Sequence, residues 1–396
     1  MVETSPGNIW IASEDGGLNV FNRSTSSYQQ FNRIPNLGTN VHSLYFDQFT
    51  NDMWIGTFRH GLFRYNLDSG QYTFYEVAPG TSSNSIFDFA RQKNGKLWIA
   101  MTQGLRWYNA ATNTFQKSGN QNLDNTFIYC LATDQNDNLW AGTTSLGLYK
   151  IDAKTSKITR WKSSEKKNDL KDDYITCIFP AKDGKIWIGT NNNGLQILNL
   201  KTGVFSELEG ELQLSRCTIC KIQPDANGHI WISTSQGLFC YDSKNRAITH
   251  FTTDDGLPTN QFNFSSSLLS SSGMMYFGTV NGLISFKPSK NIFSAPKYTT
   301  HLKTLFINGV EMNAGLSDSP LTDELDNMST IHLSYDQARS FVIDYGVISP
   351  GNVNSYVYQV WFEGIDKTWR DVNAEHRFVG YNLEEGKYIL HVRANN

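Results

Sequence analysis

The sequence predicts an all-β protein, a seven-bladed β-propeller followed by an immunoglobulin-like β-sandwich. Two observations carry this prediction: a strand-rich unit recurs seven times at steps of 42 to 47 residues, and a strand-rich segment without that period follows it. A period of about 40–45 residues with four short strands is typical of propeller blades. The aromatic anchors of the seven units are Trp10, Trp54, Trp98, Trp140, Trp187, Trp231 and Tyr276. The glycines of the Gly-Leu pairs that follow them are Gly17, Gly61, Gly104, Gly147, Gly194, Gly237 and Gly282.

One unit shows the four strands expected of a blade. Short β-branched and aromatic runs bounded by turn residues predict strands at 41–47, 52–57, 61–66 and 71–76. The second strand of each unit is apolar on both faces, so both faces must be covered. We therefore expect its Trp to be wedged between adjacent blades, where its burial contributes about 1.5–3 kcal/mol or more.

The propeller is predicted over residues 1–295 with one incomplete unit. The second and third strands are recognisable seven times, but the first and fourth only six times each. The first strand of the first blade is expected to be missing or reduced to Val2–Ser5. The sequence therefore predicts a piece of a longer protein, with an unpaired blade edge.

The sandwich is predicted over residues 298–396 and is expected to be truncated at its C-terminus. Five or six strands are predicted, and the last strand of such a domain would follow Asn396. The strand-forming segments are 301–309, 330–347, 355–364, 376–383 and 387–396.

Composition excludes several classes of protein. The formal net charge is −3 and no block of Lys and Arg stands out, so we expect no nucleic acid to bind this chain. No apolar run approaches the length of about 18 residues that a membrane span needs, and no export signal is recognisable. Of the five cysteines, Cys217 and Cys220 are predicted on opposite faces of one strand, too far apart for a disulfide. We expect buried, inert thiols.

No catalytic or metal-binding pattern is recognisable. The eight histidines lack metal-ligand spacing, and there is no nucleophile elbow, P-loop or dinucleotide fingerprint. Residues 182–187 and 225–231 loosely resemble the Asp-box turns of sialidases, but those enzymes have six blades and an arginine cluster. We therefore expect no enzyme activity, no cofactor and no metal.

A binding surface is predicted where the repeats differ. The residues between the second strand and Gly-Leu vary in every unit, and in a blade they share one rim with the crossovers that contain Asn40, Asn84, Asn125, Asp173 and Asn260. Amide and Arg side chains suit sugar hydroxyls, and an aromatic ring suits a pyranose face. The alternative is that these are solvated turns, which need Asn and Gly in any case. The candidate ligand-binding residues are Arg59, His60, Gln103, Trp107, Asn191, Asn192 and Gln236.

The recurring unit resembles the two-component regulator propeller repeat, and the C-terminal segment resembles the triple-tyrosine domain that follows such propellers. The resemblance covers essentially all 396 residues. The positions that match the triple-tyrosine domain are Tyr358, Gly364, Asp366, Trp369, Tyr381, Leu383, Gly386 and Tyr388.

The resemblance implies the periplasmic sensor region of a hybrid two-component system, with an oligosaccharide as the ligand. Family members often carry a second propeller, and they have a membrane helix and a histidine kinase that this chain lacks. Kinase activity, the link to a membrane and a homodimer are thus implied only for the full-length sensor. Two alternatives stay open: a coupling and dimerisation module that binds no ligand, and a propeller lyase or glycosidase.

Overall fold

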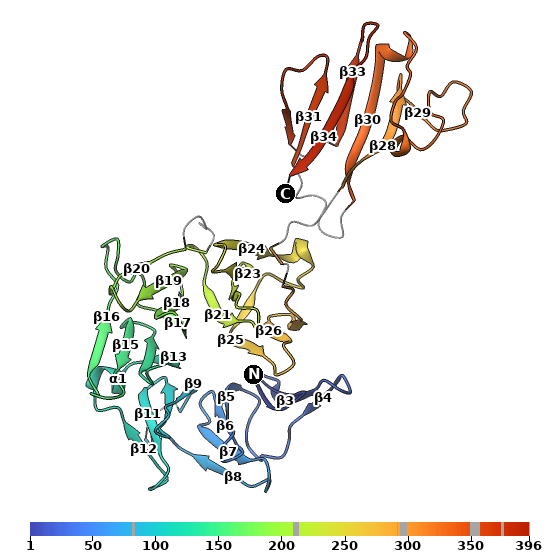
Figure 1. The fold of residues 1–396 in the computed structure, drawn as a ribbon. Helices are drawn as coiled ribbons and strands as arrows, with labels where there is room; N and C mark the ends of the chain where they lie inside the picture. Colours follow the sequence, from blue (N-terminus) through green and yellow to red (C-terminus); the bar gives the residue numbers. More distant parts are fainter. Residues whose placement is uncertain are drawn as a thin grey trace. The chain divides into compact units, whose positions relative to one another are not determined.

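The computed structural model shows an all-β chain that divides into two compact units, Met1–Phe293 and Ser294–Asn396 (Figure 1). In the described part of the chain, no helix has the length and apolar character needed to cross a membrane. The structure describes residues 1–80, 84–208, 214–290, 292–293, 299–348, 357–373 and 376–395.

The first unit contains seven antiparallel sheets among its described residues, and each sheet is formed by consecutive strands. Six sheets have four strands and the last has three. The first four sheets are formed by β1 (Val2–Ser5), β2 (Asn8–Ser13), β3 (Gly17–Asn22) and β4 (Ser27–Gln30); β5 (Val41–Asp47), β6 (Asp52–Thr57), β7 (Leu62–Asn66) and β8 (Tyr72–Tyr75); β9 (Ile86–Arg91), β10 (Leu97–Met101), β11 (Gly104–Asn109) and β12 (Thr114–Lys117); and β13 (Ile128–Thr133), β14 (Leu139–Thr143), β15 (Leu148–Ile151) and β16 (Ile158–Trp161).

The next three sheets continue in the same order, and Figure 1 shows all seven following one another in a ring, with the first strand of each sheet nearest its middle. The crossovers carry α1 (Gln121–Asn125) and the 3-10 turn η1 (Thr253–Asp255). The sheets are formed by β17 (Ile175–Pro180), β18 (Lys185–Thr190), β19 (Leu195–Asn199) and β20 (Phe205–Ser206); β21 (Ile219–Pro224), β22 (Ile230–Thr234), β23 (Gly237–Asp242) and β24 (Ala247–Phe251); and β25 (Phe262–Leu269), β26 (Met275–Thr279) and β27 (Gly282–Phe286).

The repeated tryptophans pack between neighbouring sheets, as predicted. Trp140 of the fourth sheet is fully buried and shares a core cluster with Ile186 and Ile188 of the fifth. The last sheet meets the first through Phe21 and Tyr276, whose rings lie 6.5 Å apart. The apolar runs therefore stabilise contacts between sheets, which is why both faces of each second strand are apolar.

A hydroxyl closes the loop after the second strand in most sheets. The Thr that ends this strand donates through Oγ1 to the carbonyl of the Gly-Leu glycine, over 2.8 Å from Thr190 to Gly194 and 2.8 Å from Thr143 to Gly147. The glycine itself adopts a positive φ, +62° at Gly194. The Gly-Thr and Gly-Leu pairs of the repeat are thus two halves of one turn.

Val2–Ser5 forms a short first strand, β1, that pairs with β2, which confirms the predicted alternative of a reduced first strand. Among the described residues only the last sheet lacks its fourth strand, as predicted. One detail differs from the sequence prediction. Cys217 lies in a bend before β21 and not on that strand, because the ladder of β21 with β22 begins at Ile219. The side chains of Cys217 and Cys220 are both buried, as expected.

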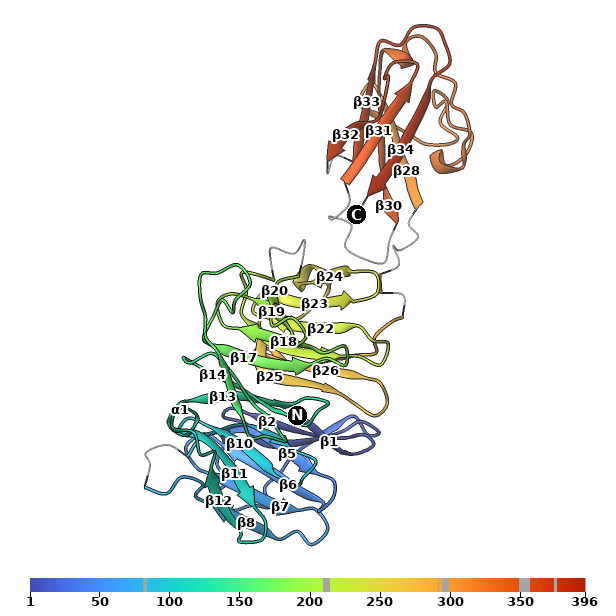
Figure 2. The same ribbon diagram turned by 60° about the vertical axis from the view of Figure 1, so that its left-hand side comes forward.

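The second unit contains two antiparallel sheets that share one core, and Figure 2 shows the strands of both. In β31, Tyr358, Val360 and Phe362 are buried and alternate with residues that are not. The sheets have the orders β29-β28-β30-β33 and β32-β31-β34, with β28 (Thr299–Ile307), β29 (Val310–Met312), β30 (Ser340–Ile348), β31 (Val357–Glu363), β32 (Arg370–Asn373), β33 (Arg377–Tyr381) and β34 (Ile389–Asn395).

The long strand predicted at 330–347 begins only at Ser340. Residues 334–339 turn instead, because the Ser334 N–H donates to the side-chain oxygen of Gln337 and the Ala338 N–H donates to the Ser334 carbonyl. The 3-10 turns η2 (Leu325–Asn327) and η3 (Gln337–Arg339) occupy this part of the chain. Such local hydrogen bonds compete with a strand ladder.

Candidate functional site

The loops between the second and third strands share one rim with the crossovers between sheets, as the sequence predicted. We call this surface the loop rim. The Gly61 N–H donates to the carbonyl of Asn84 over 3.1 Å, and the Gly237 N–H donates to that of Asn260 over 2.8 Å. In the second sheet the Phe58 N–H donates to the Asn40 carbonyl over 3.0 Å. Backbone hydrogen bonds therefore hold each variable loop in place, while its side chains remain available.

Arg59 and His60 lie on the loop rim and are exposed. Arg59 has a φ of +66°, and its N–H donates to Ser85 Oγ over 2.9 Å. Its guanidinium lies 5.0 Å from the centre of the Phe58 ring. A non-glycine residue held at positive φ is a strained position that the surrounding hydrogen bonds must stabilise. The strain presents the Arg59 side chain beside an aromatic ring.

The amide residues of the prediction also lie on the loop rim. The exposed Asn192 is anchored by its N–H, which donates to Asp172 Oδ2 over 2.9 Å, and its Oδ1 accepts a hydrogen bond from Asn191 Nδ2. Gln236 is exposed, and its carbonyl lies 2.8 Å from His250 Nε2. Gln103 is half-buried in the corresponding loop of the third sheet. These side chains can offer amide donors and acceptors to a ligand.

Trp107 does not belong to the loop rim. On β11 it pairs with Trp98 of β10, three residues beyond Gly104 at the loop. Its ring lies 4.3 Å from Nζ of Lys96, a residue of the turn between the first and second strands. That turn lies at the opposite end of the sheet, because antiparallel strands reverse direction there. The prediction that Trp107 joins the other candidates is therefore wrong.

The inner strands carry a feature that the sequence analysis did not identify, a bulge at their second residue. The pairing register of β5, β9, β13, β17 and β21 shifts at this position, next to the loop rim. A bulge frees one residue from the ladder and re-aims its side chain. The bulge residues are His42, Phe87, Tyr129, Thr176 and Cys220.

Rings from four different sheets meet at these bulges. His42 contacts Phe87 with ring centres 5.1 Å apart, and Phe87 contacts Tyr129 at 5.6 Å. Tyr129 also contacts Phe264 of β25, in the seventh sheet, at 5.7 Å. Because the fourth and seventh sheets lie apart in the ring, this contact spans its middle. The central aromatic cluster consists of His42, Phe58, Phe87, Phe127, Tyr129, Tyr174 and Phe264.

The central aromatic cluster is accessible. Phe264 is 41% exposed and the other six residues are half-buried, whereas the interblade tryptophans are buried. Contiguous aromatic surface of this kind typically marks a binding site. A signal was present in the sequence: an aromatic or His ring follows the first apolar residue of three inner strands, at Val41-His42, Ile86-Phe87 and Ile128-Tyr129.

Burial shifts the protonation of the cluster toward its neutral forms. Burial lowers the pKa of His42, although Glu14, with Oε1 3.3 Å from Nε2, favours the imidazolium. Burial also raises the pKa of Tyr129 and Tyr174. Near neutral pH the cluster therefore offers neutral rings and hydroxyl donors. Among the described residues, no group of three or more His, Cys, Asp or Glu side chains could hold a metal ion.

Comparisons with known proteins agree with the repeat pattern. Residues 122–145 and 169–192 match the family described as two component regulator propeller. Histidine kinase P4 of Formosa agariphila is 24% identical over 409 residues, which cover 98% of this chain and 29% of that protein. The chain thus spans less than a third of the length of this relative.

Two solved structures share the fold over essentially the whole chain. The extracellular domain of the hybrid two component system BT3049 from B. thetaiotaomicron superposes with a TM-score of 0.75 at 23% identity, covering 100% of this chain and 52% of that one. The extracellular domain of BT4673 from the same organism has a TM-score of 0.54 at 20% identity, covering 98% and 52%. The chain therefore spans about half the length of these structures.

Proposed function

We propose that this chain is the periplasmic, ligand-sensing part of a hybrid two-component sensor histidine kinase, and that its ligand is an oligosaccharide. In this proposal the seven sheets form a seven-bladed propeller, and the second unit is an immunoglobulin-like sandwich that passes the signal to a membrane helix and a kinase in the longer protein. The match to regulator propeller repeats and the fold shared with the extracellular domain of a hybrid two component system support it. Those neighbours also favour a binding role over a catalytic one.

The observation that carries the ligand class is the central aromatic cluster beside the polar side chains of the loop rim. Ring faces such as that of Phe264 pack against the apolar C–H faces of a sugar ring. Amide and guanidinium groups such as those of Asn192 and Arg59 hydrogen-bond its hydroxyls. A concave or open site with an apolar floor and a few polar groups is the usual composition of a small-ligand site.

The proposal is tested by calorimetric titration of the chain with a panel of neutral and acidic oligosaccharides. We expect at least one to bind, and Phe264→Ala to weaken that binding about tenfold or more through the loss of stacking. Tyr72→Ala is the matched control, because Tyr72 is also 41% exposed but lies on the outer strand β8. The Arg59→Ala, Asn192→Ala double variant tests the polar groups. Equal binding by wild type and Phe264→Ala would remove the central aromatic cluster from the site.

A coupling and dimerisation module is the alternative, and one observation in the second unit favours it. Trp361 lies on the face of β31 opposite the buried Tyr358 and Phe362, half-buried, with its ring 4.6 Å from that of His391 and 6.1 Å from that of Trp369. Aromatic residues are enriched where proteins associate. If the chain binds no oligosaccharide but sediments as a dimer that Trp361→Ala converts to a monomer, this alternative replaces the sensing proposal.

A further inference from the structure

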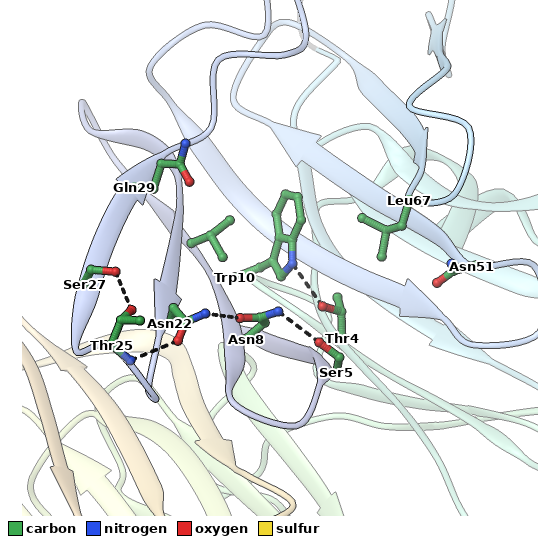
Figure 3. A pocket seen from close by; sticks show the side chains of 11 residues that line it. Thr4, Ser5, Asn8, Trp10, Asn22, Thr25, Ser27, Gln29, Asn51 and Leu67 are labelled. Atoms are coloured by element: carbon green, nitrogen blue, oxygen red, sulfur yellow. Dashed lines mark hydrogen bonds between the residues drawn. The ribbon is translucent and has the colours of Figure 1, made fainter.

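A pocket of about 530 Å³ lies between the first and second sheets, away from the loop rim (Figure 3). It opens at the turns that join the first strand to the second and the third to the fourth, since Ser5, Asn22 and Asn51 lie at or beside such turns. These turns are at the opposite end of each sheet from the loops that carry Arg59 and Asn192. The volume falls within the range of about 300–1,000 Å³ that is usual for small-molecule sites.

The lining of this turn-side pocket is polar but carries no charged side chain. Trp10, Val20 and Leu67 supply apolar surface. The polar groups are amides and hydroxyls that Figure 3 shows along the two sides of the pocket. The amides come from Asn8, Asn22, Gln29 and Asn51.

Hydrogen bonds divide the polar groups into a fixed frame and available groups. Asn22 Nδ2 donates to Asn8 Oδ1 over 3.1 Å, and Asn8 Nδ2 donates to Ser5 Oγ over 3.0 Å, so these side chains are held in place. By contrast, the Gln29 side chain is exposed, and Figure 3 shows no hydrogen bond between its amide and the other residues drawn. Asn51 donates through Nδ2 to Asp68, which leaves its Oδ1 as an acceptor. A ligand can therefore gain hydrogen bonds without breaking the frame.

The charged side chains that adjoin lining residues in the sequence already have hydrogen-bond partners. The guanidinium of Arg23 contacts Ser272 of the seventh sheet. The Glu3 carboxylate accepts hydrogen bonds from the N–H groups of Gly7 and Ser271, over 2.9 and 2.6 Å. Asp68 accepts its bond from Asn51 over 2.6 Å. An ionic ligand would thus lose hydration without meeting a counter-charge, which is unfavourable.

We infer that the turn-side pocket is a second binding site, and that it takes a neutral polyhydroxylated ligand such as an uncharged sugar. Amides that both donate and accept match hydroxyl groups, and the apolar surface of Trp10 and Leu67 matches the C–H face of a sugar ring. The site does not depend on the loop rim, since the two share no residue.

Nuclear magnetic resonance of the full chain tests this inference through the indole N–H of Trp10, which donates to Thr4 Oγ1 over 3.1 Å at the pocket wall. Trp10→Phe assigns the resonance. The probes are maltose, cellobiose and lactose, each titrated to about 50 mM, with glucuronic acid as the anionic counterpart. We expect a saturable shift with at least one neutral disaccharide, and affinity for glucuronic acid at least about tenfold weaker.

The variant Gln29→Ala, Asn51→Ala should weaken the binding of the neutral sugar about tenfold. Gln116→Ala is the matched control, because Gln116 pairs with Trp107 in the third sheet as Gln29 pairs with Val20 in the first. Phe264→Ala should also leave the shift unchanged, which separates this site from the proposed sensing site. Three outcomes would overturn the inference: no shift of the Trp10 resonance with any neutral disaccharide, equal affinity for glucuronic acid, or equal binding by the double variant. Preserved amide dispersion of the double variant shows that it folds.

Discussion

The same bulge position serves two different purposes in two halves of the ring. In the second, third and fourth sheets it carries His42, Phe87 and Tyr129, which are half-buried and contact one another. In the fifth and sixth sheets it carries Thr176 and Cys220, which are buried. Thr176 Oγ1 donates to the Ile219 carbonyl over 2.6 Å, and Cys220 Sγ to that of Phe262 over 3.2 Å. In the second, third and fourth sheets the bulge residue therefore contributes to an accessible surface. In the fifth and sixth sheets it joins adjacent inner strands.

The difference shows that the backbone is common to both halves while the side chain decides the role. Burial raises the pKa of Cys220 to about 12, so its thiol remains protonated and acts as a small buried donor. The residues that recur from sheet to sheet, such as the tryptophans and the glycines of the Gly-Leu pairs, form what we call the repeat frame, and their substitution should affect stability. Substitution of residues of the central aromatic cluster should affect binding. The predictions below test this division, from the largest expected effect to the smallest.

Loss of a frame tryptophan should have the largest effect. Trp140 is fully buried, stacks with Trp161 at 5.3 Å between ring centres and donates through Nε1 to Asp134. Trp140→Ala should lower the free energy of unfolding of the first unit by about 3–5 kcal/mol, because it leaves a cavity and removes one of the hydrogen bonds to the Asp134 carboxylate, which keeps its bonds from Asn136 and Asn138. Urea denaturation followed by fluorescence measures the change. A loss below about 1 kcal/mol would show that the sheets do not depend on this contact.

Substitution of Gly194, in the loop between β18 and β19, should have the second-largest effect on stability. A Cβ on Gly194 would lie 1.7 Å from the carbonyl oxygen of Leu214, and its φ is +62°. Gly194→Ala should therefore cost about 2–4 kcal/mol of unfolding free energy. Gly184→Ala is the control: its φ is +81°, but a Cβ there meets no atom within 4 Å, so only the conformational cost of about 1–2 kcal/mol applies. If Gly194→Ala and Gly184→Ala lose the same unfolding free energy in thermal and urea denaturation, the close approach of Gly194 to Leu214 does not contribute.

Removal of the hydroxyl that closes the loop should have an intermediate effect. Thr190 Oγ1 donates to the Gly194 carbonyl and accepts from the Asn193 N–H over 3.1 Å. Thr190→Val keeps the shape and leaves both groups without this partner, which should cost about 1–3 kcal/mol. Thr190→Ser should recover most of the loss in the same denaturation assay. If valine is tolerated as well as serine, the recurring Thr is kept for packing alone.

Replacing an aromatic bulge residue by the small residue found at the same position in the next sheet should affect binding more than stability. Tyr129→Thr places in the fourth sheet the residue that the fifth sheet carries at Thr176. We expect oligosaccharide affinity, measured by calorimetry, to fall about tenfold through lost ring contact. Cys220→Ser changes the small bulge residue of the sixth sheet, which lies outside the central aromatic cluster, and should leave affinity unchanged. The reverse pattern would place the binding surface on the other half.

The smallest expected effect is on the pH dependence of the unfolding free energy. The pKa of His42 is lowered by burial, so below its ordinary value of 6.5 the unfolded chain binds more protons at this residue than the folded chain does. The contribution of His42 to stability is therefore complete above pH 6.5 and decreases as the pH falls below that value. His42→Phe should make the unfolding free energy less dependent on pH between about 6.5 and 5, by less than one proton equivalent. An unchanged slope would mean that Glu14 offsets the burial.

The frame was predictable because it follows from local rules. Strands at 41–47 and 52–57 were predicted and are β5 and β6. The shared rim of loops and crossovers was also predicted correctly. A further regularity went unnoticed, an indole acceptor six residues before the Trp: Trp98 Nε1 donates to Gln92 and Trp231 Nε1 to Asp225. This spacing is visible in the sequence, but its meaning depends on the turn between the first two strands.

The candidate site was only partly predictable. The exposed positions of Arg59 and Asn192 on the loop rim were predicted correctly, because loop residues are exposed wherever the hairpin is correctly placed. Trp107 was placed wrongly, since its distance along β11 from the loop decides which end of the sheet it reaches. The bulges were missed because they depend on pairing register, which local sequence specifies weakly.

The sequence by itself determined the repeated frame of this protein. Strand alternation, turn chemistry and the spacing of tryptophans and glycines act over a few residues and recur in every unit. Only the tertiary structure decided which variable residues meet. Two sheets lie between Tyr129 and Phe264 along the chain, and the two rings come into contact because the ring brings the fourth and seventh sheets to a common centre. Contacts across a ring depend on its closure and on the direction each bulge imposes, and neither follows from the period of the repeat.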